Sequence, residues 1–135
     1  MGRREPTWLS RAQVEAIHAI QLEQHGGLAG TRDVGALEAA IGRARNRWHY
    51  GAASDLSACA AAFGFAIATS HPFSDGNKRT AFQSMFVFLA LNNVDLVAAE
   101  PEAVLTMLAV ATGEMGEDEL AEWLRENTRR RSRRR

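Results

Sequence analysis

The chain of 135 residues almost lacks lysine: Lys78 is its single lysine, against 15 arginines. It also holds a single cysteine, Cys59, which excludes an internal disulfide and a Cys-x-x-Cys pair that binds zinc. Cys59 lies in an alanine-rich stretch, where a free cysteine is most often a small buried hydrophobe. Because lysine occurs only at position 78, the function of Lys78 needs closer study.

Long apolar runs are missing as well. No run of about 18 apolar residues exists, so we expect no membrane-spanning helix and no membrane partner. Residues 1–10 carry basic side chains but no apolar segment after them, which argues against a signal peptide. Together these absences predict a cytoplasmic protein.

The formal net charge is zero, but the charge is unevenly distributed. Six of the 16 basic residues lie in residues 129–135, and residues 1–128 carry a net charge of −6. The length suits one domain, which we expect to cover residues 1–128. A block of like charges repels itself, so residues 129–135 are predicted to form a disordered arginine-rich tail. Such a tail either contacts nucleic acid electrostatically or is a solvated end without a fixed role.

Apolar residues recur at helical intervals along almost the whole chain, which predicts an all-α fold. Ser10 and Gln13 form a potential capping box for the first helix, and Gly26 follows its end. The pattern predicts about six helices in one compact bundle. They are expected to begin near residues 10, 33, 54, 77, 101 and 117.

The connections are shorter than the helices and contain one candidate strand. Residues 49–51 are expected to form a connection after the second helix, and residues 94–98 a very short strand. Residues 85–91 are apolar on every side, which predicts that the helix of residues 77–91 is the central buried helix.

Polar side chains of several kinds gather in the segment HPFSDGNKRT, residues 71–80, between two apolar helices. The first N–H groups of a helix have no internal partner, and the helix dipole favours anions there. Lys78 and Arg79 are therefore unfavourable at the start of a helix unless an anion such as phosphate binds beside them. Gly76 permits a positive φ or the close approach of a ligand to the backbone.

Two further residues of this segment add chemistry. Asp75 offers a hard oxygen ligand for Mg²⁺, which takes one or two carboxylates together with phosphate oxygens. His71 can accept a proton near neutral pH. Each feature alone has a plainer interpretation, as a turn, a solvated charge pair or a structural histidine. Their joint occurrence favours a phosphate-handling site, with Phe73 as the core anchor of the loop, and neither a Walker A motif nor a kinase glycine-rich loop is present.

The segment HPFSDGNKR, residues 71–79, resembles the signature of the Fic/Doc superfamily. Fic enzymes carry HPFxxGNGR, whereas the Doc (death-on-curing) branch has a lysine where this chain has Lys78. The segments GLAGTRD (residues 27–33) and LEAAI (residues 37–41) are similar to the Doc pattern as well. The resemblance covers about residues 8–98 and implies a helical bundle whose active loop lies between the central buried helix and the helix before it.

The resemblance implies the toxin of a type II toxin–antitoxin module in the bacterial cytoplasm. Fic enzymes transfer AMP from ATP to a protein hydroxyl. Doc proteins transfer the γ-phosphoryl group of ATP to a threonine of elongation factor Tu, which arrests translation. A Phd-type antitoxin would neutralise the toxin by folding into a groove on it, and operator DNA would be contacted only through the antitoxin.

The family motif also implies a role for each matched residue. His71 would be the general base that accepts the proton of the target hydroxyl, and Asp75 would hold Mg²⁺. The phosphates of ATP would be bound by Gly76, Asn77, Lys78 and Arg79. Two alternatives remain open: an AMP-transferring enzyme on the same fold, or a catalytically silent module that assembles an antitoxin–DNA complex.

This chain departs from the family pattern after Ile41, because residues 42–50 lack the Arg-Pro pair that is often found there. Trp48, His49 and Tyr50 either line the groove or pack under the loop. No Ser or Thr is followed four residues later by Glu, so the self-inhibitory helix motif of some Fic proteins is absent. We therefore expect inhibition to come from another chain.

Overall fold

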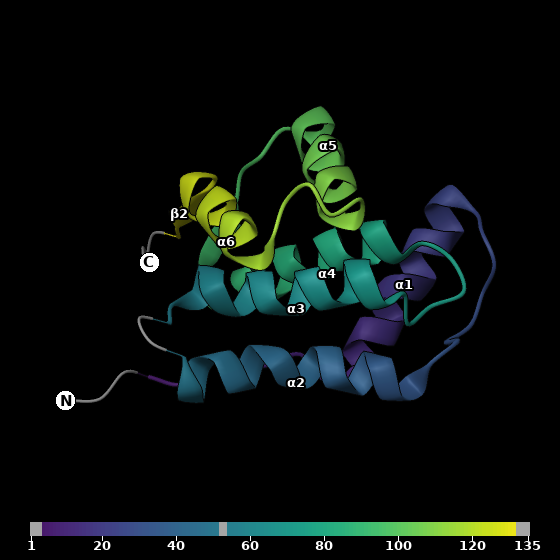
Figure 1. Ribbon diagram of the computed structural model, residues 1–135, viewed down its shortest axis with the longest axis horizontal. Helices are drawn as coiled ribbons and strands as arrows, with labels where there is room; N and C mark the ends of the chain where they lie inside the picture. Colours follow the sequence, from purple (N-terminus) through teal and green to yellow (C-terminus); the bar gives the residue numbers. More distant parts are fainter. Residues whose placement is uncertain (1–3, 52–53, 132–135) are drawn as a thin grey trace.

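The computed structural model describes residues 4–51 and 54–131, which form six helices and one pair of short strands (Figure 1). In chain order the elements are α1 (Arg11–His25), α2 (Val34–Tyr50), α3 (Leu56–Ser70), α4 (Asn77–Leu91), β1 (Val94–Leu96), α5 (Glu100–Ala111), α6 (Glu117–Glu126) and β2 (Thr128–Arg130). None of the described helices has the length and apolar character needed to cross a bilayer. The predicted all-α architecture is confirmed.

Local capping explains where most of the helices begin. The Ser10 side chain accepts the N–H of Gln13, and the Gln13 side chain accepts the N–H of Ser10, which closes the predicted capping box. Asp33 and Asp55 cap α2 and α3, each by accepting one backbone N–H. The start of α4 differs from these, because its N-cap is Gly76 and no side chain caps it.

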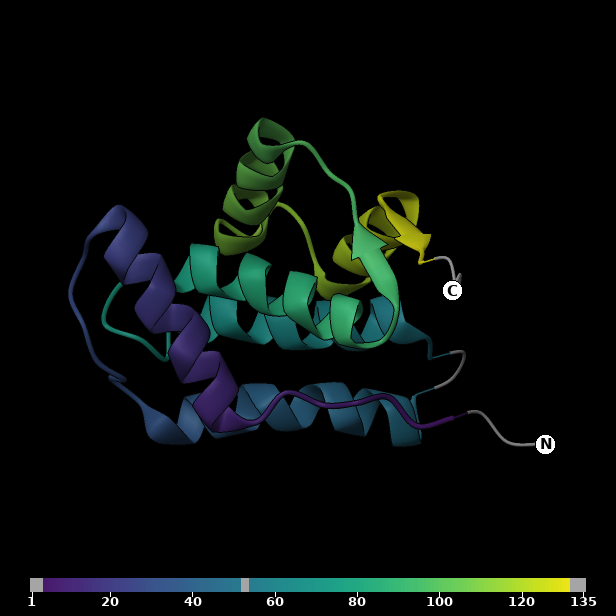
Figure 2. The same cartoon turned by 180° about the vertical axis from the view of Figure 1, so that it is seen from behind.

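The core is built around α3, which is buried along most of its length. Its many alanines allow α2, α4 and α6 to pack closely around it (Figure 1). Figure 2 shows α1 crossing the loop end of α4 on the other side of the molecule. The prediction that α4 is the central buried helix is wrong: α3 has that position, and α4 is buried along one face only, since its Phe86 and Leu91 are 40% and 43% exposed.

The second helix is longer than the sequence pattern predicts. α2 continues to Tyr50, so the expectation that residues 49–51 form a connection is wrong for its first two residues. Tertiary contacts extend the helix: Trp48 packs against the core, and His49 Nε2 lies 3.4 Å from a Glu5 carboxylate oxygen. None of residues 48–50 lines the pocket around the active loop.

The arginine-rich segment after residue 128 is partly ordered. β2 pairs antiparallel with β1, which confirms the predicted strand, and Arg129 lies opposite Asp95. The Arg131 guanidinium donates to Asp95 Oδ1 from two nitrogens, at 2.5 and 3.2 Å. The predicted disorder is therefore wrong for residues 129–131, because strand pairing and a carboxylate partner hold them. Residues 132–135 lie outside the described residues.

Candidate active site

The loop of residues 71–76, which joins α3 to α4, turns sharply at both of its ends. His71 leaves α3 with a φ of 53°, and Gly76 enters α4 with a φ of 75°. A residue other than glycine in this left-handed region costs about 1–3 kcal/mol, and such strain is concentrated at functional sites. The His71 N–H still donates to the Ile67 carbonyl at 3.2 Å, so the turn begins on the last turn of α3.

Asn77 holds this loop closed with its side-chain amide. Its Oδ1 accepts the Phe73 N–H and its Nδ2 donates to the Phe73 carbonyl, both at 3.0 Å. Phe73 is only 1% exposed and anchors the loop in the core, as predicted. The Asn77 amide is thus committed mainly to the loop backbone, whereas the resemblance implied a phosphate ligand. Its backbone N–H in the first turn of α4 remains for an anion.

His18 of α1 supports the same loop from inside the protein. Its ring stacks on Phe73 with centroids 3.9 Å apart, and its Nε2 lies 2.8 Å from the Asp75 carbonyl oxygen. A carbonyl can only accept, so this nitrogen carries the proton. The sequence pattern assigns His18 no role in the site, because a histidine on the first helix is typically structural or exposed. No sequence signal linked it to a loop that lies 57 residues away.

The segment of residues 27–33 braces the loop from outside. The N–H groups of Arg32 and Asp33 both donate to the Pro72 carbonyl, at 2.8 and 2.9 Å. The Arg32 guanidinium also donates to the His71 carbonyl. This family-like segment therefore fixes the backbone on which His71 is mounted.

The Asp75 carboxylate is exposed at the turn of the loop. Oδ1 accepts the Gly76 N–H at 2.9 Å, and Oδ2 accepts the Leu28 N–H at 3.3 Å. A Cβ at Gly27 would come within 2.9 Å of Oδ2, and Gly27 has a φ of 120°, so glycine suits this neighbouring position. Each carboxylate oxygen keeps a lone pair for a cation.

A metal ion at Asp75 would need ligands from outside the described side chains. No group of three or more His, Cys, Asp or Glu residues that could hold a metal occurs in residues 4–51 and 54–131. Mg²⁺ accepts this arrangement, because it usually combines one or two carboxylates with phosphate oxygens and water. Asp75, which shares its pocket with a second acidic residue, Glu100, therefore fits Mg²⁺ that arrives with a phosphate group.

The first turn of α4 is left open beside this carboxylate. Lys78 and Arg79 are exposed, and neither has an ion-pair partner in the part of the chain that the structure describes. With no side-chain cap, the first N–H groups of α4 and the two cations create a positive site. Such a helix terminus is suited to a phosphate group.

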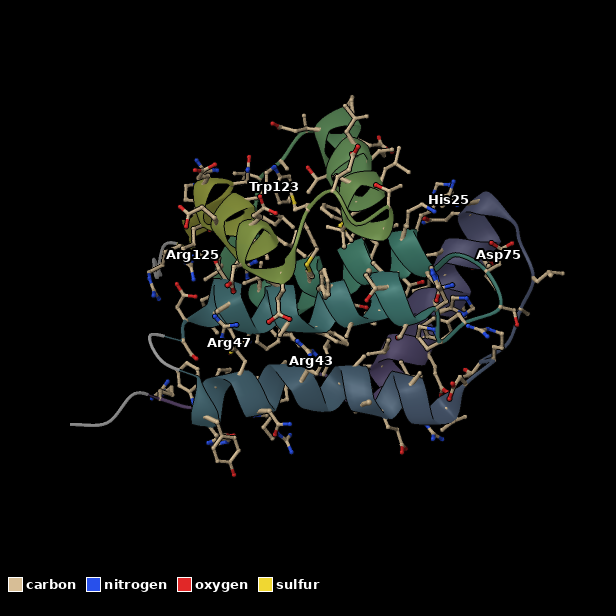
Figure 3. All side chains as sticks on the ribbon, in the orientation of Figure 1. His25, Arg43, Arg47, Asp75, Trp123 and Arg125 are labelled. Atoms are coloured by element: carbon tan, nitrogen blue, oxygen red, sulfur yellow. The ribbon has the colours of Figure 1, made fainter. Side chains whose placement is uncertain are left out.

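His71, Asp75 and the first turn of α4 line one open pocket of about 780 Å³, a volume typical of ligand sites. Its other walls are polar side chains at the end of α1, including His25, and apolar side chains of α5, including Val104 and Met107. Figure 3 shows His25 and Asp75 at the same end of the molecule. The structure brings together all six predicted site residues, which are His71, Asp75, Gly76, Asn77, Lys78 and Arg79.

Comparisons with known proteins agree with this geometry. The model of the Fic/DOC family matches residues 8–89, which include the loop and the bracing segment. The chain is 38% identical over 117 residues to "Protein kinase doc" of Escherichia phage P1, which covers 87% of this chain and 92% of the phage protein. It is 39% identical over 74 residues to "Toxin Doc" of Mycolicibacterium smegmatis, which covers 54% of this chain and 57% of that toxin. The chain therefore belongs to the Fic/Doc family.

Proposed function

We propose that this chain is the toxin of a toxin–antitoxin module and acts as a protein kinase. It would transfer the γ-phosphoryl group of ATP to a serine or threonine hydroxyl of a translation factor, with elongation factor Tu as the expected target. The observation that carries this proposal is one pocket that combines a histidine, a carboxylate, two unpaired cations and an uncapped helix terminus. The name "Protein kinase doc" of the phage relative supports the kinase activity, and the name "Toxin Doc" of the second relative supports the toxin role.

Recognition of the phosphates would begin at α4. The N–H groups of residues 77–79 lie in the first helical turn, where no helix carbonyl can accept them. The phosphates of ATP would accept these donors and offset the like charges of Lys78 and Arg79. Phosphoryl transfer depends mainly on positioning and charge neutralisation, and this end of α4 can supply both.

His71 would act as the general base. One of its ring nitrogens would accept the proton of the target hydroxyl while the hydroxyl oxygen attacks the γ-phosphorus. The bond between the γ-phosphorus and the oxygen that bridges it to the β-phosphorus breaks, and ADP leaves. Hydrogen bonds from Arg32 to the carbonyls of His71 and Pro72 keep the backbone of the base in place during this step.

Asp75 would hold Mg²⁺, which when bound neutralises part of the phosphate charge. The Gly76 and Leu28 N–H groups each occupy one lone pair of the carboxylate and so fix its orientation. The contact from His18 to the Asp75 carbonyl fixes the backbone of the same residue. The metal ligand and the base would thus be held by separate sets of contacts.

The partner of this toxin is proposed to be a Phd-type antitoxin that covers α5. Val104, Leu105 and Leu108 are 60%, 65% and 47% exposed, which leaves an apolar helix face open. Exposed apolar faces of this kind mark protein interaction sites. Since Val104 also lines the active pocket, an antitoxin segment on this face would lie beside the catalytic loop.

Intact-mass analysis of elongation factor Tu tests the proposed reaction. After incubation with the whole chain, ATP and Mg²⁺, the factor should gain the mass of one phosphoryl group on a serine or threonine. The chain with His49→Ala, which removes an exposed histidine outside the pocket, should give the same gain. A gain equal to AMP would instead identify a Fic-type AMP transferase. No gain, together with growth arrest that persists in His71→Ala, would identify a binding module without catalysis.

A further inference from the structure

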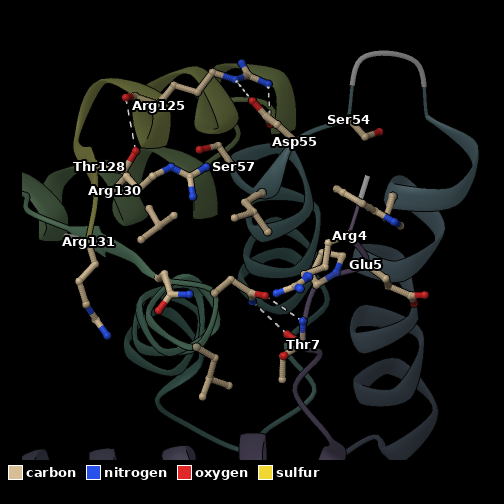
Figure 4. Close-up of a pocket in the computed structure, with 17 residues that line it drawn as sticks. Arg4, Glu5, Thr7, Ser54, Asp55, Ser57, Arg125, Thr128, Arg130 and Arg131 are labelled. Carbon is tan, nitrogen blue, oxygen red and sulfur yellow. Dashed lines mark hydrogen bonds and ion pairs between the residues drawn. The ribbon is translucent and has the colours of Figure 1, made fainter. Parts of the chain in front are cut away.

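A second pocket, of about 670 Å³, lies at the other end of the α3–α4 pair (Figure 4). It is formed where α3 begins and α4 ends, together with residues 4–7 and with Thr128, Arg130 and Arg131. α3 has 15 residues, so at 1.5 Å per residue roughly 22 Å of helix separates this pocket from the active loop. The first and last described residues of the chain both lie at this end (Figure 1).

Two of the four arginines that line this pocket are fully engaged. Arg125 forks onto Asp55, with distances of 2.8 and 3.2 Å, and its third nitrogen lies 3.1 Å from Glu122. Arg131 pairs with Asp95 across the two strands. These two guanidinium groups hold the walls of the pocket together, and their hydrogen-bonding capacity is largely used.

The other two arginines of the lining, Arg4 and Arg130, are unpaired. Both are exposed, and neither guanidinium has a carboxylate partner in the described part of the chain. Figure 4 shows them reaching into the pocket from two sides, without a dashed line to either. Of the two acidic residues of the lining, Asp55 is already paired with Arg125. Glu5 accepts the Trp8 indole N–H at 2.8 Å and lies 3.4 Å from His49 Nε2, so its carboxylate is directed to these two side chains.

Further groups at this pocket favour a phosphate ligand. Ser57 and Thr128 belong to the lining, and the Ser57 hydroxyl can donate to an anion, whereas the Thr128 hydroxyl already donates to the Arg125 carbonyl at 3.5 Å. The planar guanidinium fork matches two phosphate oxygens at once, which a lysine cannot do. In the sequence, three more arginines follow at positions 133–135, so basic residues are concentrated in the last seven positions of a sequence that is otherwise acidic.

We propose that this end of the protein binds the phosphodiester backbone of a nucleic acid without reading its sequence. Contacts to phosphates fix position and carry no base information. The pocket lining also includes Trp48 and Leu91, whose apolar surface can contact a sugar or a base. An acidic polypeptide would match the charge but would leave that apolar surface unused, so a nucleic acid fits better.

Fluorescence anisotropy with the whole chain tests this proposal. Labelled duplex DNA and labelled single-stranded RNA of equal length are titrated separately, which distinguishes the two sources of phosphodiester. The logarithm of the binding constant should fall linearly with the logarithm of the salt concentration. For duplex DNA the slope should be about −0.9 for each phosphate contact. The double variant Arg4→Gln with Arg130→Gln should bind at least about tenfold more weakly, and its salt slope should be lower by about 2.

Two control variants separate the pocket from general charge. Arg129→Gln removes one charge from the same strand but outside the pocket lining, so its effect should be much smaller. The charge-conserving double variant Arg4→Lys with Arg130→Lys should keep the salt slope and lose only part of the affinity, because an ammonium group cannot contact two phosphate oxygens at once. Phosphoryl transfer should be unchanged in all of these variants, because the active loop lies at the other end of α3; this readout keeps the present proposal separate from the proposed kinase function.

Three results would overturn the proposal. The first is a double glutamine variant that binds nucleic acid as tightly as the unmodified chain. The second is an Arg129→Gln variant that loses as much affinity as the double variant, since that would show a diffuse effect of charge. The third is competition by polyglutamate as strong as that by nucleic acid of equal charge, which would assign this end to an acidic protein partner instead.

Discussion

The two helices that flank the active loop begin in opposite ways. α3 begins after Asp55, whose carboxylate accepts a backbone N–H at 2.8 Å and pairs with Arg125. α4 begins after Gly76 with no side-chain cap, and Lys78 and Arg79 stand in its first turn. The first arrangement satisfies a helix N-terminus, whereas the second leaves it open and adds like charge. The open end is favourable only with an anion, so the difference between two neighbouring helices marks where phosphate binds.

The largest effect should follow the loss of the base at the open end. His71→Ala should slow phosphoryl transfer by about 10²–10⁴-fold, because no other group takes the proton of the target hydroxyl. Thermal unfolding should change little, since the His71 side chain is exposed and its hydrogen bonds are made by the backbone. Transfer rates with elongation factor Tu and melting curves of the same samples measure both. A rate within a few fold of the unmodified chain would remove His71 from the mechanism.

Lys78→Arg tests whether the uncapped start of α4 requires the compact shape of the lysine ammonium group as well as its charge. The chain uses arginine everywhere else, so a spare positive charge would tolerate this change. We expect transfer to fall by roughly 10–100-fold, because a planar guanidinium replaces a compact ammonium beside the phosphates. The matched control Arg129→Lys, at the far end, should keep full activity. Full activity of Lys78→Arg would show that charge alone is required.

Asn77→Ala removes the clamp that keeps the loop in register with α4. Loss of both bonds to the Phe73 backbone should lower the free energy of unfolding by about 1–3 kcal/mol and should also weaken ATP binding. Asn77→Asp keeps the hydrogen-bond acceptor and loses the donor. Its free energy of unfolding should therefore lie between those of the unmodified chain and Asn77→Ala. Urea unfolding and ATP titration measure these effects. Unchanged stability in Asn77→Ala would mean that the clamp does not order the loop.

The smallest effect should come from the capped helix end. Asp55→Ala should cost about 1 kcal/mol of stability through the lost cap, and Asp55→Asn, which can still cap, should cost less. Neither variant should alter the rate of phosphoryl transfer. A changed rate with intact folding would contradict the view that this end of α3 takes no part in phosphoryl transfer.

The contribution of the Asp55 carboxylate to stability at the start of α3 should depend on pH. Burial raises the pKa of Asp55, but hydrogen bonds from Arg125 and the Ala58 N–H outweigh burial, and the net pKa lies below its ordinary value of 3.8. A depressed pKa in the folded state contributes stability above the ordinary pKa, and this contribution is lost as the pH falls through the folded value. The stability difference between the unmodified chain and Asp55→Asn should therefore be constant near neutral pH and shrink below about pH 4. Melting curves across this range measure the difference.

Local signals predicted the fold well where a few neighbouring residues decide the structure. The pair Ser10 and Gln13 and the cap Asp55 act within three residues of a helix start, so the sequence pattern identified these starts correctly. The prediction failed where distant segments decide. Tyr50 belongs to α2 because Trp48 packs this end of the helix against the core. Arg129 is ordered because β2 pairs with β1, which lies more than thirty residues earlier in the sequence.

The active loop shows the same division. The motif residues are contiguous, so their gathering at one helix start could be predicted from the sequence. The support from His18 could not, because only tertiary packing stacks its ring on Phe73. The two bonds from the Asn77 side chain to Phe73 could not be predicted either, since a motif does not show which polar atoms the loop backbone consumes.

The most direct test of the account is a backbone amide NMR titration of the whole chain with ATP and Mg²⁺. The largest shifts are predicted at the N–H groups of residues 77–79, at the open start of α4. The N–H groups of residues 56–58, at the capped start of α3, should shift little. Saturating ATP without shifts at residues 77–79, or with equal shifts at both helix starts, would contradict the claim that the open helix end is the phosphate site.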